Sequence, residues 1–282
     1  MPIFPNSVVD FIRSALTEDI GHGDITTSLT VDAKAIAEAN VVAKESLVVA
    51  GLPFFALVFE LLDRAVGRAV DIRLLREDGA ALAKGDKIAR VSGNTRSLLT
   101  GERVALNILQ RLSGIATLTR RFADEVRDLP VQVVDTRKTT PNMRYMEKYA
   151  VRIGGGGNHR FGLYDCVLIK DNHIKAAGGI TRAVERVRQA APFLMKIEVE
   201  VGNMEELREA LDAGVDVVML DNMSIDDMVK AVALVNKRVM VEASGNVTLG
   251  NIRQIAQTGV DIISSGYLTH SAQAADISMK II

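Results

Sequence analysis

Hydrophobic and polar positions along the chain change their pattern near residue 112. Before that point, two stretches rich in Val, Ile and Leu, 38–50 and 70–76, predict β-strands. A shorter strand is predicted at 85–93, between turn glycines, and an apolar helix is predicted at 53–66. This irregular mixture of strands and a helix predicts an N-terminal α+β domain over residues 1–112.

The pattern from Thr95 to Arg127 is helical, because apolar side chains recur at steps of three and four residues. Val104, Ile108 and Leu112 form one apolar stripe of this helix, and such a stripe must be buried. Gly114 predicts a break in the helix, since glycine is a poor helix former.

After residue 130 the chain alternates strands and helices with a regular spacing, and amphipathic helices such as 203–213 and 224–235 fill the gaps. This alternation predicts a parallel sheet over the second domain, residues 113–282. The predicted strands are 131–135, 166–170, 195–201, 216–220, 238–242 and 260–264.

Polar residues at the strand ends distinguish between the two arrangements that such a sheet can take. In an α/β barrel all carboxyl ends of the strands meet in one ring, whereas a doubly wound sheet binds ligands mainly at one switch point. Polar endings on nearly every strand favour an irregular barrel with fewer than eight strands. These endings are Asp135, Lys170, Glu200, Asp221, Glu242, Ser244, Ser264 and Ser265.

Composition limits the function more than it identifies it. With 48% hydrophobic and 24% charged residues the chain can form a core, and a net charge of −1 implies no general polyanion-binding surface. Its one cysteine, Cys166, suits a reducing compartment. No secretory signal or membrane-spanning stretch is recognisable, so we expect a cytoplasmic protein without nucleic-acid or membrane partners.

Two segments offer positive charge for binding an anion. The first, residues 135–141, has two adjacent cations among hydroxyl groups, and Pro141 suits the first turn of a following helix, whose N-terminus favours anions. The second, 154–160, has four glycines followed by His159 and Arg160, as expected for a loop that bends freely or lies against a ligand. A solvated basic loop and a flexible linker are the alternative interpretations.

Charged residues at the next strand ends also have two interpretations. Lys170 could form a Schiff base or bind an anion by charge. Glu198 and Glu200 alternate with apolar residues and so share a face, and Asp221 ends the following strand. Such carboxylates suit Mg²⁺, although an internal ion pair with the neighbouring cations would also explain them.

Small, hydroxyl-bearing loops follow the last two strands, at 242–246 and 264–267. Phosphate sites of α/β barrels often lie after the last strands, where backbone N–H groups bind the oxygens. The chain shows no Ser-His-Asp or Cys-His nucleophile arrangement, so we expect chemistry that depends on charge neutralisation and positioning.

Several of these segments together resemble the quinolinate phosphoribosyltransferase family, and the resemblance runs in order from about residue 10 to 280. Asn142 departs from the pattern, where glycine is expected, but Asn tolerates a left-handed backbone. The matching segments are Glu18–Thr27, Gly101–Asn107, Asp135–Pro141, Glu147–Val151, Gly154–Arg160, Leu168–His173, Ile197–Val201, Leu220–Asn222 and Glu242–Asn246.

The resemblance implies an N-terminal α/β sandwich domain with a dimer-forming helix, an incomplete C-terminal barrel and an active site completed by a second subunit. It implies that Arg103 comes from the partner and that Arg137, His159, Arg160 and Lys170 bind quinolinate. Phosphoribosyl pyrophosphate would be held by Lys138, Glu200 and Asp221, with Mg²⁺ on the last two, and Thr136 would be a further substrate-binding residue. The 5′-phosphate would be bound by Ser244, Gly245, Asn246, Ser265, Gly266 and Tyr267.

On this resemblance we expect a cytoplasmic homodimer that makes nicotinate mononucleotide, pyrophosphate and CO₂ for NAD biosynthesis. Lys138, Lys170, Glu200 and Asp221 are the expected catalytic residues. Three alternatives are a related phosphoribosyltransferase of the molybdenum-transport-associated type, a Schiff-base aldolase using Lys170, and a non-catalytic barrel that binds a phosphometabolite.

Overall fold

The computed structural model describes residues 4–66 and 70–282, and these form two compact units. The first unit runs to Arg120 and also contains Thr139–Gly155 and Thr269–Ile282. The second consists of Arg121–Lys138 and Gly156–Leu268. The compact units therefore do not follow the predicted domain boundary at residue 112, because two later segments of the chain, 139–155 and 269–282, also belong to the first unit.

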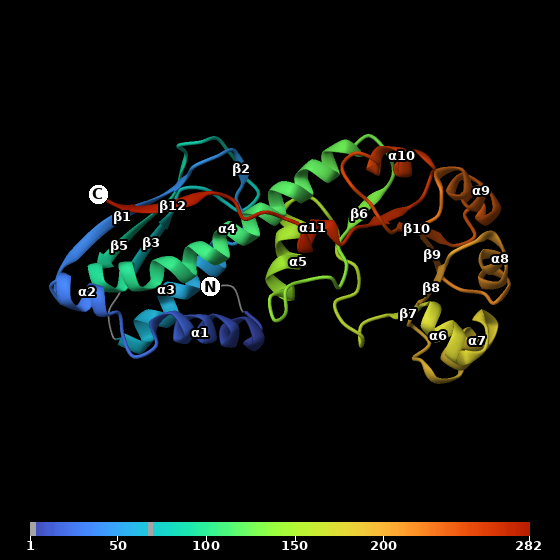
Figure 1. The fold of residues 1–282 in the computed structure, drawn as a ribbon, viewed down its shortest axis with the longest axis horizontal. Helices are drawn as coiled ribbons and strands as arrows, with labels where there is room; N and C mark the ends of the chain where they lie inside the picture. Colours follow the sequence, from blue (N-terminus) through green and yellow to red (C-terminus); the bar gives the residue numbers. More distant parts are fainter. Residues whose placement is uncertain (1–3, 67–69) are drawn as a thin grey trace. The chain divides into compact units, whose positions relative to one another are not determined.

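An antiparallel sheet forms the centre of the first unit, in the order β12-β1-β5-β3 (Figure 1). The strand β12 at the chain end pairs with β1, so that Val41 lies opposite Met279, a pairing that the local pattern did not predict. A smaller pair, β2-β4, adds to the unit. The strands are β1 (Ile36–Ala43), β2 (Leu47–Val48), β3 (Val70–Leu74), β4 (Ala81–Leu82), β5 (Lys87–Asn94) and β12 (Ile277–Ile281).

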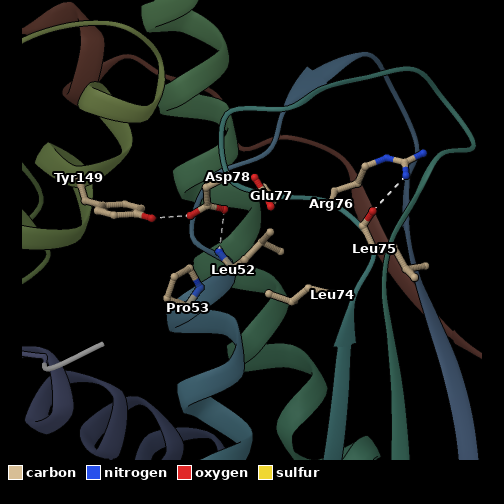
Figure 2. Close-up of a pocket in the computed structure, with 8 residues that line it drawn as sticks. All are labelled: Leu52, Pro53, Leu74, Leu75, Arg76, Glu77, Asp78 and Tyr149. Atoms are coloured by element: carbon tan, nitrogen blue, oxygen red, sulfur yellow. Dashed lines mark hydrogen bonds between the residues drawn. The ribbon is translucent and has the colours of Figure 1, made fainter. Parts of the chain in front are cut away.

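Helices of the first unit bury large apolar side chains, among them Phe54, Phe55 and Phe59 of α3. Asp78 fixes the beginning of α3, because its carboxylate accepts hydrogen bonds from the N–H groups of Gly51 and Leu52 and from the Tyr149 hydroxyl (Figure 2). The helices are α1 (Asn6–Ile20), α2 (Ile25–Thr30), α3 (Leu52–Val66), α4 (Thr95–Glu125), α5 (Arg144–Ile153) and α11 (Tyr267–His270); α4 continues into the second unit, and α11 crosses from the second unit into the first.

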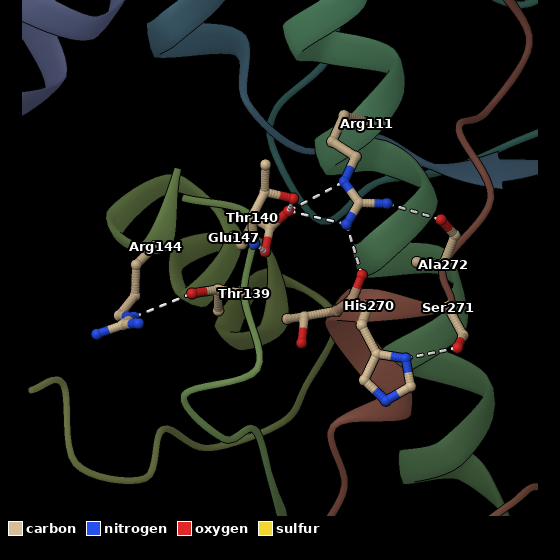
Figure 3. A network of polar contacts seen from close by, with 9 residues as sticks. Arg111, Thr139, Thr140, Arg144, Glu147, His270, Ser271 and Ala272 are labelled. Carbon is tan, nitrogen blue, oxygen red and sulfur yellow. Dashed lines mark hydrogen bonds and ion pairs between the residues drawn. The ribbon is translucent and has the colours of Figure 1, made fainter. Parts of the chain in front are cut away.

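A buried ion pair connects three separate segments of the first unit (Figure 3). Glu147 of α5 is fully buried and accepts two hydrogen bonds from Arg111 of α4, at 2.8 and 3.0 Å, and two from Thr140. Arg111 also donates to the carbonyl oxygens of Thr269 and Ala272. With its partners supplied from all three segments, the buried charge is compensated.

The helix α4 is continuous through Gly114, so the predicted break at this residue is wrong. A Cβ atom at Gly114 would lie 1.9 Å from the carbonyl oxygen of Gln273. The glycine thus permits the close approach of the segment that leads to β12 and does not interrupt the helix. The stripe Val104, Ile108 and Leu112 is buried within the chain, so it cannot supply an apolar surface to a second subunit.

The second unit has a parallel sheet of six strands among its described residues, each within two residues of its predicted position. The order is β6-β11-β10-β9-β8-β7, and helices α7 to α9 pack on β8 to β10 (Figure 1). The strands are β6 (Gln132–Val134), β7 (Val167–Ile169), β8 (Ile197–Val201), β9 (Val217–Asp221), β10 (Met240–Ser244) and β11 (Ile262–Ser264).

Capping residues fix the helices that connect these strands. Asn203 accepts hydrogen bonds from two N–H groups at the beginning of α8, and Ser224 does the same for one N–H of α9. Asn236 ends α9 in the left-handed conformation. The helices are α6 (Asp171–Ala177), α7 (Ile180–Ala190), α8 (Met204–Asp212), α9 (Ile225–Val235) and α10 (Ile252–Gln257).

Within the described ranges, no helix combines the length and the apolar composition that a bilayer-spanning segment requires.

Gly114→Ala is expected to destabilise the protein by about 1–3 kcal/mol, because the added methyl group would overlap the Gln273 carbonyl. This steric cost opposes and exceeds the gain of about 1 kcal/mol that alanine brings to a helix. Urea unfolding measures the change, with Asn107→Ala on the exposed face of the same helix as the control. A variant as stable as the original chain would contradict the close packing.

Candidate active site

Buried Asp135 follows β6 and anchors the loop that carries His159. Its carboxylate accepts hydrogen bonds from the Asn158 amide at 2.6 Å and from the His159 N–H at 2.9 Å. The next three residues, Thr136, Arg137 and Lys138, are at least partly exposed, and the Thr136 hydroxyl accepts from the Lys138 N–H. Asp135 thus fixes the position of the loop at Asn158 and His159, while the three residues after Asp135 remain accessible to a ligand.

His159 contacts carboxylates from two strands that are not neighbours. Its Nε2 atom lies 3.3 Å from Glu198 of β8 and 3.4 Å from Glu242 of β10. His159 lies beside β6, because Gly157, two residues before it, pairs with Val134 of that strand. In a flat sheet with this strand order, β6 and β8 would be about 19 Å apart. The contacts therefore require the sheet to curl, as the barrel prediction expects.

At neutral pH the cluster of His159, Glu198 and Glu242 binds one more proton than the same three side chains would bind in water. Burial disfavours the charged imidazole, but hydrogen bonds to Glu198 and Glu242 outweigh it and raise the pKa of His159 to about 9. Burial also raises the pKa of the Glu198 carboxyl. The Arg160 N–H donates to Nδ1 of His159 at 2.7 Å, whereas Nε2 faces both glutamates, so the additional proton can lie on His159 or be shared with a glutamate. The cluster has one net negative charge in either case.

Cations lie near this negative cluster. Arg160 is close enough to Arg137 that burial and the neighbouring guanidinium together lower its pKa. Lys170, after β7, forms an ion pair with Glu200 at the end of β8. The predicted internal ion pair is thus present at Glu200, and Glu200 and Glu198 project from the same face of β8.

Glu200 and Asp221 lie at the carboxyl ends of adjacent parallel strands, β8 and β9. Their side chains are neither fully buried nor fully exposed. Carboxylate oxygens at such strand ends, with access for water and substrate, suit Mg²⁺. The residues therefore fit the predicted magnesium site, whereas the three-residue group with metal-ligand spacing is His159, Glu198 and Glu242, deeper in the unit.

The two serine-containing loops lie beside each other. Ser244 ends β10 opposite Asp221, and its hydroxyl accepts a hydrogen bond from Ser264 at 3.1 Å. Gly245 and Asn246 follow with positive φ angles of 92° and 50°. The second loop, residues 265–267, begins where the Ser265 N–H donates to Val134 of β6. Both loops thus lie at the same end of the sheet as the carboxylates.

The glycine-rich segment and Pro141 differ from their predicted roles. A Cβ atom at Gly154 would lie 2.6 Å from the Ala116 carbonyl, and one at Gly157 would lie 2.5 Å from Gln132. These glycines permit close packing within the protein, so the expected freely bending loop is wrong. Pro141 precedes α5, which begins at Arg144, and is not in its first turn. Asn142 has the expected left-handed backbone, with φ of 64°.

The structure brings nearly all predicted site residues into the second unit; Arg103 belongs to the first, on an exposed position of α4. Sequence reasoning left out Glu198 and Glu242 as site residues, although their alternation with Glu200 and Ser244 on the same strand faces would have indicated them. Both ring nitrogens of His159 have protein partners, so its expected direct role toward substrate is not evident in this geometry.

A barrel whose strand ends combine cations, paired carboxylates and serine–glycine loops has the arrangement of a transferase for anionic, phosphate-bearing substrates. The chain matches the profile of the quinolinate phosphoribosyl transferase N-terminal domain over residues 24–113 and that of the C-terminal domain over residues 115–280. It therefore belongs to the quinolinate phosphoribosyltransferase family and is an enzyme of that family.

Relatives and solved structures agree with this assignment. The chain is 47% identical to a probable carboxylating nicotinate-nucleotide pyrophosphorylase of Synechocystis sp., covering 99% of this chain and 94% of the relative. A Bacillus subtilis protein of the same description is also 47% identical, over 94% and 90% of the two chains. The structure of NadC from Streptococcus pyogenes superposes with a TM-score of 0.94 at 43% identity, covering 100% of this chain and 99% of that one.

Glu198→Gln is expected to reduce but not remove a pH dependence of stability, because Glu242 remains as a carboxylate beside His159. Above about pH 6.5 the unfolded chain has neutral His159 and two charged glutamates, so the folded cluster binds one additional proton. This contribution to the free energy of unfolding is present at low pH and is lost as pH rises toward the His159 pKa of about 9. The loss has an upper limit of about 1.4 kcal/mol per pH unit.

Urea unfolding at pH 7, 8 and 9 would measure this slope. Glu185→Gln, at an exposed position of α7, is the control and should keep the original slope. An unchanged slope in Glu198→Gln would show that Glu198 does not contribute to the binding of the additional proton.

Proposed function

We propose that the chain transfers the phosphoribosyl group of phosphoribosyl pyrophosphate to quinolinate, giving nicotinate mononucleotide, pyrophosphate and CO₂. This reaction belongs to NAD biosynthesis. The observation that carries the proposal is the family match over residues 24–113 and 115–280, combined with the cations grouped at the strand ends of the second unit. We also propose that the protein is located in the cytoplasm.

Quinolinate is a pyridine with two adjacent carboxylates, and Arg137, Arg160 and Lys170 provide positive groups for them. Burial and, after it, the nearby charge of Arg137 lower the pKa of Arg160, so a negative ligand would favour the charged guanidinium. Because the ring of His159 accepts a hydrogen bond from the Arg160 N–H, we propose that His159 positions Arg160 and shapes the pocket rather than donating to quinolinate.

Phosphoribosyl pyrophosphate would bind across the neighbouring strand ends. Thr136 and Lys138 would contact it after β6, and Glu200 and Asp221 would hold Mg²⁺ on its pyrophosphate side. Mg²⁺ held by these residues would neutralise charge on the leaving pyrophosphate. The 5′-phosphate would accept hydrogen bonds in the two loops, from residues 244–246 and 265–267.

The residues of the chain position the reactants and compensate charge. The pyridine nitrogen forms a bond to C1 of the ribose while the bond from C1 to pyrophosphate breaks, and the carboxylates of Glu200 and Asp221 would face the positive charge that develops on the oxocarbenium-like ribose. The carboxylate next to the nitrogen then leaves as CO₂, and its electron pair remains on the ring carbon until a proton is taken up. The cations Arg137, Arg160 and Lys170 stabilise that ring anion.

The alternatives predict different chemistry. A Schiff-base aldolase needs the Lys170 amine free to attack a carbonyl group, whereas this amine is engaged in an ion pair with Glu200. A phosphometabolite-binding barrel would not need the carboxylates at the ends of β8 and β9. The intact motifs at 135–141 and 168–173 argue against the molybdenum-transport-associated type.

We propose further that the protein acts as a homodimer in which Arg103 reaches the quinolinate site of the partner subunit. Arg103 is exposed on α4, and the apolar stripe of that helix is buried in its own chain. The helix can therefore present polar residues such as Arg103 to a second subunit, and a two-fold axis would create two equal sites.

Purified protein mixed with quinolinate, phosphoribosyl pyrophosphate and Mg²⁺ is expected to produce nicotinate mononucleotide and CO₂ in equal amounts. Replacing quinolinate by nicotinate should reduce kcat/KM by about a hundredfold or more, because one carboxylate leaves the grouped cations under-compensated. Chromatography of the nucleotide and trapping of CO₂ measure both products. Comparable use of nicotinate would contradict the proposed substrate.

Arg103→Ala and Lys170→Ala are each expected to abolish activity, and mixing them should restore part of it. In a mixed dimer with exchanged arginines, one site carries both defects and the other carries neither, so about half of the original activity per mixed dimer is the upper limit. Native mass spectrometry would establish that mixed dimers form. Mixed dimers without recovered activity would exclude a shared site.

A further inference from the structure

Asn222 directly follows Asp221 at the end of β9 and has an unusual backbone conformation. Its φ angle of 54° lies in the left-handed region, which asparagine adopts more readily than most residues. The Asn222 N–H donates to the carbonyl oxygen of Ser244 at 3.0 Å. The conformation therefore turns the chain from β9 toward the loop that follows β10.

The side-chain amide of Asn222 forms two hydrogen bonds, one through its nitrogen and one through its oxygen. Its Nδ2 donates to the Asp221 Oδ2 at 2.9 Å, and its Oδ1 accepts from the Asn246 Nδ2 at 2.9 Å. The first bond restricts the orientation of a carboxylate and leaves the other oxygen, Oδ1, for a ligand. The second bond restricts Asn246, the last residue of the proposed phosphate loop.

Gly245 connects the same two groups sterically. A Cβ atom at Gly245 would lie 2.2 Å from the Asn222 Oδ1, so the amide of Asn222 occupies the space that any other residue at 245 would need. The contacts continue beyond the loop, since the Asn251 amide donates to the Asn246 carbonyl and the Thr248 N–H donates to Asn251. The amide of Asn222 is thus packed between the end of β9 and a structured loop.

We infer that Asn222 is a positioning residue that couples the carboxylate of Asp221 to the loop of residues 244–246. The inference rests on the proposed function, in which Asp221 lies at the metal and pyrophosphate end of phosphoribosyl pyrophosphate and the loop binds its 5′-phosphate. Asn222 holds the two ends of this substrate site at a fixed separation. Quinolinate binds at other residues, so Asn222 affects one substrate and not the other.

Asn222→Gly is the variant that tests the coupling, because glycine adopts the left-handed backbone and removes both side-chain hydrogen bonds. We expect the KM for phosphoribosyl pyrophosphate to rise about tenfold or more, while the KM for quinolinate changes by less than about twofold. The Kd of nicotinate mononucleotide, measured by calorimetry without metal, should rise about tenfold, because this ligand reports on the phosphate loop independently of turnover.

Asn222→Asp separates the two hydrogen bonds, since it keeps an oxygen that can accept from Asn246 and places a second carboxylate against Asp221. We expect the Mg²⁺ concentration for half-maximal activity to change in this variant. Asn236→Gly is the matched control, because Asn236 is also left-handed, with φ of 45°, and caps α9 away from these residues. It should leave both KM values unchanged.

Equal increases in both KM values, or unchanged values in Asn222→Gly with an unchanged Kd, would overturn the inference. A similar effect of Asn236→Gly would also overturn it, since a general loss of backbone order would then explain the result. Thermal unfolding of each variant checks that the fold is kept. If the original chain makes no nicotinate mononucleotide, the proposed function fails; if it is active and Asn222→Gly behaves like it, only the coupling fails.

Discussion

The contact between His159 and the buried carboxylates of Glu198 and Glu242 is the interaction on which the catalytic unit depends. It joins residues next to β6, on β8 and on β10, and so is possible only in a curled sheet. The curl in turn brings the strand ends into a ring. Asp135 supports the contact from the other side, because it accepts from the N–H of His159.

Electrostatic balance explains why buried carboxylates lie close to the cations of the proposed quinolinate site. Burial and the nearby Arg137 guanidinium both disfavour the charge of Arg160, and Glu198 of the cluster favours it. The negative cluster partly compensates these cations in the absence of substrate. Because its remaining proton keeps the cluster at one negative charge rather than two, the cations are only partly neutralised and can still attract an anion.

Local sequence pattern predicted those features that depend on local interactions. The six parallel strands and the helices between them follow from the alternation of apolar and polar residues, and the polar strand ends indicated where the ring of site residues would lie. The roles of Gly114 and Gly157 could not be predicted, because they depend on Gln273 and Gln132, which are distant in the sequence. Glu198 had a visible alternation with Glu200, but its partner His159 became evident only in the folded chain.

The position of β12 has a consequence for how the protein is made. This strand is synthesised after all the strands of the barrel, yet it pairs with β1, which precedes them in the sequence, and the segment before it packs against Gly114. The sheet of the first unit therefore has an incomplete edge until β12 has been synthesised, and an unpaired edge strand can pair with other chains. We expect the barrel strands, which are all synthesised earlier, to fold before that edge is covered, so that the first domain in the sequence is the last to be completed.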